Sequence, residues 1–402
     1  MLFLNSLRYN NNQIYIGTAW MDSWFDFDKR IFKYFSYSLM LQLIPLFAIS
    51  SYLIYEINIK LFNKQMVYYF IAFIVFIIAA IIPWRKILWW FAPLFYIVNL
   101  GLLIAVNYVG KTILGAKRWI ELPGIHITIQ PSEFIKVNVI MMLAYLIHKK
   151  PPPEQGYGLF QFIKLSLVIV IPFVIIAKEP DLGTALVLLI TGYGILFLIG
   201  VNWKIWLTIA IVAGVSAPIV YEKGLKPYQK KRIHDMLNKP SYQVRQALIA
   251  IGSGGMEGKP KEDATQTQLK FLPVSSTDFI FAYLGERLGF KGMITVIGLY
   301  ILLIFNLLYI SWKHKRDYLI KTFAGGLAFL IFVYMGVNIF MIIGLAPVVG
   351  LPLPMFSHGG TSFIIFAVIF GMLQNLIAFK DYSRYTSDAK ITMQTKGTPV
   401  LK

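Results

Sequence analysis

The sequence predicts an all-α membrane protein of about ten transmembrane helices, with one large ordered loop between the seventh and the eighth. Hydrophobic residues make up 57% of the 402 residues and charged residues only 14%, whereas a soluble domain carries roughly a quarter charged residues. Many windows contain the about 20 consecutive apolar residues that a spanning helix needs. Since no soluble domain or low-complexity tract is visible, we expect residues 1–402 to form a single polytopic membrane domain.

The predicted spans follow one another with mostly short connections. They cover residues 36–56, 65–84, 87–108, 132–148, 159–177, 182–200, 203–221, 293–312, 322–345 and 363–379. The polar N-terminal segment is not a cleavable signal, so the first span is expected to remain as an anchor. Lys and Arg are more frequent in the short loops on one side of the membrane than in those on the other side, as is typical of cytoplasmic loops. This bias places both termini in the cytoplasm.

The overall charge and the absence of cysteine exclude several functions. The formal net charge is +19, which in a soluble protein would suggest nucleic-acid binding. In so apolar a chain, basic residues are typical of cytoplasmic loops beside anionic lipid, so we expect membrane lipids and no nucleic acid as partners. The chain has no cysteine, which excludes disulfides, thiolate catalysis and Cys-ligated metals.

Residues 222–292 form the one long predicted loop, on the extracytoplasmic side. The loop contains aromatic residues, amphipathic stretches and a GSGG turn, not the Gly/Ser or Pro composition of a flexible linker. We therefore expect it to be ordered and to pack against the outer face of the membrane domain.

Ionisable residues near the ends of spans are costly unless they pair or line a cavity, and the first group of them lies in residues 115–137. Glu133 and Lys136 share a helix face, and Lys117 and Arg118 add cationic donors that suit phosphate. An interfacial ion pair at the start of a helix, capped by Ser132, explains Glu133 and Lys136 equally well.

Two aspartates begin later segments on the same predicted side. Asp181 stands at the start of the sixth span and could simply cap that helix. Asp278 follows a polar run and precedes FIFAYL; it too could be a cap. A partly desolvated carboxylate at this place would have a raised pKa and could act as a general base. Glu286 and Arg287, close by, could form an interfacial ion pair.

The segment PVVGLPLPMFSHGGTSF, residues 347–363, cannot be a continuous helix because of its Pro and Gly content. Irregular backbone is tolerated near a membrane where protein covers it or water reaches it. His358 could hydrogen-bond in such a cavity or be a satisfied structural residue. Together these features predict a polar, cationic, carboxylate-bearing outer face for an amphiphile with an anionic head group. A channel, a transporter and a membrane enzyme all fit this description.

An ordered set of motifs resembles a known family. GAKRWI with QPSEFIK, EPDLGT, AIGSGG, TQTQLKFLP, STDFIFAYLGERLG and PVVGLPLPMFSHGG occur in that order between about residues 115 and 363. They resemble the SEDS peptidoglycan polymerases, named for shape, elongation, division and sporulation. PVVGLPLP and the TQ before LKFLP are closer to the elongation branch, the RodA type, than to the division branch, the FtsW type.

The resemblance implies a SEDS fold and a glycosyltransferase that joins the sugars of lipid II into glycan strands, during elongation, on the outer face of the bacterial cytoplasmic membrane. Asp278 matches the family's essential aspartate and is expected to act as general base, with inversion at the anomeric carbon and undecaprenyl pyrophosphate as leaving group. A class B penicillin-binding protein, a transpeptidase, is the expected partner, together with other elongation-complex proteins. A lipid II flippase is the alternative, and a partner-binding scaffold is a third interpretation.

Motif positions suggest the residues that bind substrate. These are Lys117, Arg118, Glu133, Lys136, Asp181, Gln266, Ser357 and His358. No cofactor is certain, but Mg²⁺ or Mn²⁺ near phosphate would use one or two carboxylates, and Asp181 and Asp278 could supply them.

The chain departs from the family pattern at several positions. Val274 and Ser276 replace the usual Glu and His before TDF, so a carboxylate and a hydrogen-bonding side chain are missing beside Asp278. Glu179 replaces a Gln, Arg287 a second Glu, and His358 a Tyr. The proposed base itself is retained.

Overall fold

The computed structural model describes residues 35–113, 116–121, 128–179, 181–224, 230, 234, 240–269, 271–272 and 274–380. The predictions for both chain termini, and for the side chain of Lys117, lie outside these described residues. Ten long helices coincide with the ten predicted spans. They are α3 (Tyr37–Ile57), α4 (Ile59–Ile81), α5 (Trp84–Val109), α6 (Pro131–Lys149), α7 (Leu159–Lys178), α8 (Leu182–Ile199), α9 (Trp203–Ile219), α13 (Ile280–Lys313), α14 (Tyr318–Ile342) and α15 (Gly360–Ala378).

Eight of these helices in the described part of the chain are long and apolar enough to cross a membrane. α9 is apolar but only 17 residues long. α6 is 19 residues long and carries Glu133 in its first turn and His148 and Lys149 in its last. Each predicted span therefore overlaps a helix, although the ends differ, and the helices that can cross a membrane make this a multi-pass membrane protein.

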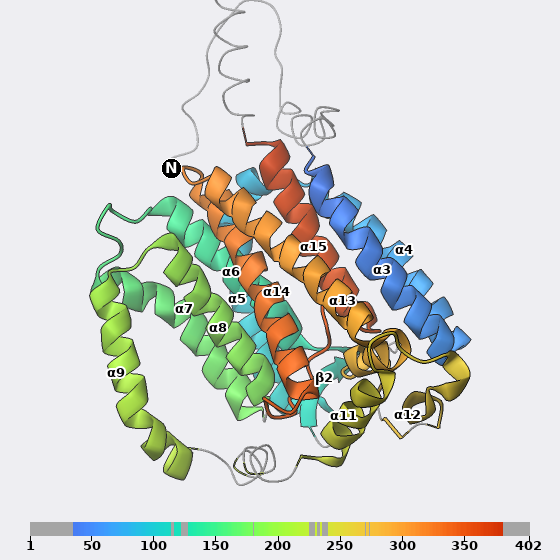
Figure 1. Cartoon of the computed structure of the whole chain (residues 1–402). Helices are drawn as coiled ribbons and strands as arrows, with labels where there is room; N and C mark the ends of the chain where they lie inside the picture. Colours follow the sequence, from blue (N-terminus) through green and yellow to red (C-terminus); the bar gives the residue numbers. More distant parts are fainter. Residues whose placement is uncertain are drawn as a thin grey trace, which may run out of the picture.

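The smaller elements gather at one end of the bundle. Strands β1 (Lys111–Ile113), β2 (Ala116–Glu121) and β3 (Thr128–Ile129) form an antiparallel sheet in the order β1-β2-β3. The loop after α9 contains the π-helical turn η1 (Val220–Gly224), α11 (Tyr242–Gly254), the 3-10 turn η2 (Lys261–Asp263) and α12 (Thr265–Gln268). In Figure 1, β2, α11 and α12 lie at one end, opposite the start of α3 and the end of α15.

The prediction placed residues up to 292 in the loop, but α13 already begins at Ile280. Its first turns are separated from the predicted span by a kink at Gly289, whose φ is 63°. A Cβ added there would lie 2.4 Å from the backbone nitrogen of Gly258. Only glycine combines this left-handed backbone with so close an approach. The described part of the loop therefore packs directly on the beginning of α13, and its predicted extracytoplasmic position stays a prediction.

α14 forms the centre of the bundle and contacts α6, α8, α13 and α15 (Figure 1). In the most apolar stretch of α14, 67% of the residues are buried inside the protein, as expected for a helix that is hydrophobic on all sides. By contrast, no residue of α9 is buried. α9 is joined to α7 and α8 through Trp206, whose indole packs edge-on against Phe162 and Tyr193. The central helix is thus the rigid element on which a site can be built.

Candidate functional site

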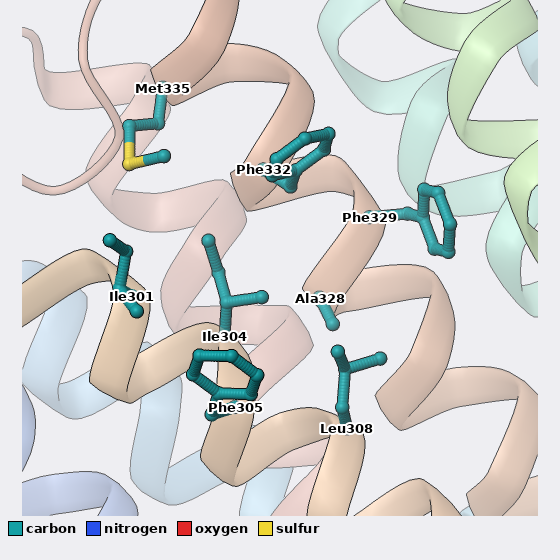
Figure 2. Close-up of a pocket in the computed structure, with 8 residues that line it drawn as sticks. All are labelled: Ile301, Ile304, Phe305, Leu308, Ala328, Phe329, Phe332 and Met335. Carbon is teal, nitrogen blue, oxygen red and sulfur yellow. The ribbon is translucent and has the colours of Figure 1, made fainter.

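An apolar cavity of about 450 Å³ lies between α13 and α14. Figure 2 shows that its lining consists of aliphatic and aromatic side chains and one methionine, with no titratable group. The lining residues are Ile301, Ile304, Phe305, Leu308, Ala328, Phe329, Phe332 and Met335. A cavity without polar groups cannot orient a sugar or a phosphate. The candidate active site therefore lies among the polar clusters of the bundle.

Asp278 is half-buried in the turn that leads into α13. The turn begins at Val274, a non-glycine residue with a φ of 56°. The carboxylate faces Gly350, where an added Cβ would lie 3.5 Å from Oδ2. Burial raises the pKa of Asp278 above its ordinary value, while a hydrogen bond from the Thr277 hydroxyl opposes this shift. A carboxylate with a raised pKa in a partly dry turn has the properties of a general base.

Ser357 and His358, both predicted to bind substrate, lie against the same turn. The backbone nitrogen of His358 donates to the Ser276 carbonyl at 2.9 Å. The Ser357 hydroxyl donates to the Thr277 carbonyl at 2.7 Å and accepts from the Leu353 nitrogen. Since Ser357 is buried and both of these bonds go to backbone, the structure places it as a support of the turn.

The imidazole of His358 contacts α4, whereas its backbone nitrogen contacts the turn that carries Asp278. Its Nδ1 lies 2.9 Å from Oε1 of Gln65 in α4, and its ring is 6.0 Å from that of Tyr68. Burial, aided by the nearby Lys64, lowers the pKa of His358. The side chain is therefore neutral near pH 7 and partly exposed, so it can still hydrogen-bond a ligand.

A second cluster joins β2 to the start of α8. Arg118 Nη1 lies 3.4 Å from Oδ1 of Asp181, and Gln130 Nε2 lies 3.4 Å from Oδ2. Asp181 also accepts from the Thr184 nitrogen at 3.2 Å, so it caps α8 as the alternative interpretation predicted. The capping interpretation of Asp181 is therefore confirmed, and the same Oδ1 that caps α8 also faces Arg118. Its substrate-binding role stays a prediction.

Glu179 stands beside this pair and is 3% exposed. Burial, reinforced by the charge of Asp181, raises the pKa of Glu179 to about 8, and Arg118 opposes the shift. Glu179 is therefore mostly protonated at neutral pH. The departure from the family pattern at this position thus adds no full negative charge to the cluster.

The third cluster is the predicted pair of Glu133 and Lys136 on α6. Lys136 Nζ lies 2.6 Å from Glu133 Oε1 and contacts the hydroxyl of Tyr334 on α14. That hydroxyl donates to Glu133 Oε2 at 3.1 Å. Lys136 is 3% exposed, so this is a buried triad and not an interfacial ion pair. Tyr334 was missed from sequence, since nothing local distinguishes it from other aromatic residues of a spanning helix.

α14 links the third cluster to the turn that carries Asp278. Tyr334 and Asn338 are one helical turn apart and share a face. Asn338 Nδ2 donates to the Asp278 carbonyl at 2.9 Å and to the Leu351 carbonyl at 2.7 Å. The second cluster is next to the loop that follows α14, because α8 packs closely on this loop at Gly183. A Cβ added to Gly183 would lie 2.7 Å from Cβ of Val349. All three clusters thus surround one end of α14 and the loop that follows it.

Gln266 and the nearby Glu286 form a supporting structure. Glu286 is fully buried and accepts from the Gln266 nitrogen and the Thr267 hydroxyl, each at 2.9 Å. The predicted ion pair between Glu286 and Arg287 is wrong, because neighbouring helical residues point about 100° apart. Arg287 instead pairs with Glu56 of α3 through contacts of 2.6 and 2.8 Å.

The described residues contain no group of three or more His, Asp and Glu side chains that could hold a metal ion. Asp181 already has Arg118 and Gln130 as partners. An ion at this end of the bundle would therefore need further ligands from a bound phosphate.

Comparisons with known proteins agree with these features. Residues 29–382 match the family model of the FtsW/RodA/SpoVE proteins, described as cell cycle proteins. The peptidoglycan glycosyltransferase MrdB of Helicobacter pylori strain 26695 is 48% identical over 90% of this chain and 94% of its own. The MrdB protein of Escherichia coli K12 is 35% identical over 84% of this chain and 92% of its own.

Solved structures support the fold. The rod shape-determining protein RodA of Thermus thermophilus aligns over 86% of this chain and 97% of its own, with a TM-score of 0.63 and 24% identity. A chain from a peptidoglycan synthase complex aligns over 86% and 98%, with a TM-score of 0.71 and 24% identity. With the family model and the sequence relatives, these results show that the chain belongs to the FtsW/RodA/SpoVE family, the SEDS family that its motifs resemble.

Proposed function

We propose that the protein is a peptidoglycan glycosyltransferase that polymerises lipid II into glycan strands during cell elongation. Its relatives from Helicobacter pylori and Escherichia coli are named peptidoglycan glycosyltransferases. The observation that carries the proposal is the arrangement at the end of α14. A partly desolvated carboxylate, Asp278, lies on one side, and the partly exposed Arg118 and the buried Lys136 lie on the other.

The chemistry assigned to Asp278 is general-base catalysis. The 4-hydroxyl of the acceptor N-acetylglucosamine gives its proton to the carboxylate as its oxygen attacks the anomeric carbon of the donor. The new glycosidic bond forms as the bond to undecaprenyl pyrophosphate breaks, and the anomeric carbon is inverted. Burial supports this role because a base whose pKa lies nearer the working pH transfers protons more effectively.

The cations are assigned to the pyrophosphate, where negative charge develops as the bond breaks. Arg118 is oriented by Asp181, and Lys136 by Glu133 and Tyr334. Charged groups that are already fixed cost little reorganisation when the leaving group develops its charge. Lys117 belongs to the same strand, β2, and adds a further positive charge. If a Mg²⁺ or Mn²⁺ ion takes part, Asp181 would help to hold it and the ion would supply the same neutralisation of phosphate charge.

We further propose the orientation and the partner. The end of the bundle that carries β2, α11 and α12 faces the outside of the cytoplasmic membrane, and both chain termini face the cytoplasm. The partner is a class B penicillin-binding protein that cross-links the new strands. The likeness to a chain from a synthase complex that coordinates polymerisation and crosslinking supports this partner.

The test is Asp278→Asn in proteoliposomes supplied with lipid II and the partner transpeptidase. We expect glycan strands to disappear while the thermal unfolding curve shows a folded protein. Asp263→Asn is the matched control, since Asp263 is an exposed aspartate of the same loop, in η2. Unchanged polymerisation by Asp278→Asn would contradict the general-base assignment. Lipid II translocation without polymerisation by the unmodified protein would favour the flippase.

A further inference from the structure

The turn that carries Asp278 is held by its backbone. Three successive carbonyl groups, those of Ser276, Thr277 and Asp278, each accept a hydrogen bond from outside the turn. The donors are the His358 nitrogen, the Ser357 hydroxyl and Asn338 Nδ2. Two of these donors belong to the irregular segment before α15, and the third belongs to the rigid central helix α14. Asn338 is therefore the one that ties the turn to the bundle core.

Asn338 is an unusual residue for its place. It lies within an otherwise apolar helix and is 0% exposed. Burial of a primary amide is unfavourable unless its groups are hydrogen-bonded. Its two donor hydrogens are used on the carbonyls of Asp278 and Leu351, but its Oδ1 has no partner among the described residues. Reversing the amide would point an oxygen at two carbonyl oxygens, so the orientation is fixed.

The second acceptor of Asn338 explains what the amide positions. The Leu351 carbonyl follows directly after Gly350, the residue that faces the Asp278 carboxylate. Gly350 has a φ of 71°, so this turn also needs a support. One amide thus sets the distance between the backbone that carries the carboxylate and the loop that covers it.

We propose that Asn338 is a positioning residue of the reaction, which fixes Asp278 against the Gly350 turn. The inference rests on the proposed function of Asp278 as general base. Without the amide, the hydrogen bonds to the turn from outside come only from the segment before α15, and the turn can move away from Gly350. The carboxylate then becomes better hydrated, and it no longer holds its place relative to the acceptor hydroxyl. A displacement of about 1 Å at a reacting group is enough for a roughly 100-fold loss of rate.

The test is Asn338→Leu, which keeps the branching and the number of heavy atoms of the side chain and removes both donors. We expect the kcat for lipid II polymerisation to fall about 10- to 100-fold, with a small change in KM. The acid limb of the pH–rate profile should move to lower pH, because better hydration lowers the pKa of Asp278. In the structure, burial raises the pKa of Asp278 and the hydrogen bond from the Thr277 hydroxyl lowers it. His358, the titratable residue of the facing segment, is neutral near pH 7.

The matched control is Asn375→Leu. Asn375 is also 0% exposed, and its Nδ2 donates to a backbone carbonyl, that of Ala80, at 2.8 Å. It lies near the end of α15, away from the candidate site. This variant loses a comparable buried hydrogen bond, and its pH–rate profile should match that of the unmodified protein. If Asn338→Leu does not yield folded protein, Asn338→Ser, which keeps one donor, is compared in the same way.

The outcomes separate the two hypotheses. A shifted profile and reduced kcat in the Asn338 variant alone support the positioning role. A profile that coincides with that of the unmodified protein, or equal unshifted losses in both asparagine variants, would overturn it. If Asp278→Asn still polymerises, the general-base assignment has failed. If Asp278→Asn is inactive while Asn338→Leu is normal, only the positioning role has failed.

Discussion

The cationic region around Arg118 and Lys136 differs from the region around Asp278 in how its charges are held. Each cation has a carboxylate partner, Asp181 or Glu133, at 3.4 and 2.6 Å. Asp278 is fixed through its backbone, and its carboxylate has a raised pKa because burial dominates. The groups to which we assign a permanent charge are paired, whereas the group to which we assign proton exchange is held by atoms that do not titrate. The comparison suggests that positioning and charge are controlled separately in this site.

The largest expected effect comes from removing a paired cation. Lys136→Met should lower the rate of glycan polymerisation by roughly 10²- to 10³-fold, because a fixed charge at the leaving group is lost. The initial rate with lipid II in liposomes measures it. Loss of the cation also leaves the partly buried Glu133 carboxylate without its ion-pair partner, with only the Tyr334 hydroxyl still donating to it, which destabilises the protein.

The double variant Lys136→Met with Glu133→Gln separates the two effects. It should regain thermal stability, since no unpaired charge remains, and it should stay inactive. Recovery of the polymerisation rate in the double variant would mean that the pair is only structural.

A buried pair outside the site sharpens the comparison. Arg287 and Glu56 are 8% and 9% exposed and join α13 to α3. Arg287→Met should reduce stability by about 3–5 kcal/mol, as expected when one partner of a buried pair is removed. Thermal unfolding in detergent measures the loss. Lys291→Met, which breaks the exposed pair with Glu257, should change stability little. Equal effects of the two substitutions would contradict the burial argument.

The raised pKa of Asp278 predicts how activity and stability depend on pH. The base must be ionised, so the rate should fall on acidification at a pH above the ordinary aspartate value of about 4. The folded state favours the protonated form, so the ionised carboxylate reduces stability above that ordinary value. Asp278→Asn should therefore raise the unfolding temperature near pH 7, and the difference should vanish below about pH 4. An unchanged unfolding temperature at neutral pH would argue against a desolvated carboxylate.

The smallest expected effect concerns Glu179, a carboxyl group in the cationic region that lacks full charge. Its pKa of about 8 lies above the unfolded value. Stability contributed by its protonated form is therefore lost as the pH rises through about 8. Glu179→Gln should remove this part of the pH dependence and leave the polymerisation rate at pH 7 nearly unchanged. Thermal unfolding between about pH 4 and pH 9 checks it, because this span includes the ordinary glutamate pKa of about 4 and the folded pKa of about 8.

The sequence by itself determined the membrane class, the ten helical segments and most of the polar residues at the site. These features follow from local patterns: runs of apolar residues, helix caps such as Asp181, and the spacing of Glu133 and Lys136 on one face. The start of α13 was placed too late, because Glu286 and Arg287 interrupt its apolar sequence and the kink at Gly289 separates its first turns from the predicted span. Motif resemblance supplied the role expected of Asp278, which composition and periodicity could not distinguish from a cap.

Only the tertiary structure decided which residues act together. Tyr334 and Asn338 look like ordinary members of an apolar helix until α6 and the Asp278 turn are placed beside them. The partner of Arg287 proved to be Glu56, far away in sequence. A side chain's partner depends on packing between elements distant in the chain, and helical periodicity contains no information about which faces meet. The sequence therefore named the charged groups, and the fold determined how each one is held.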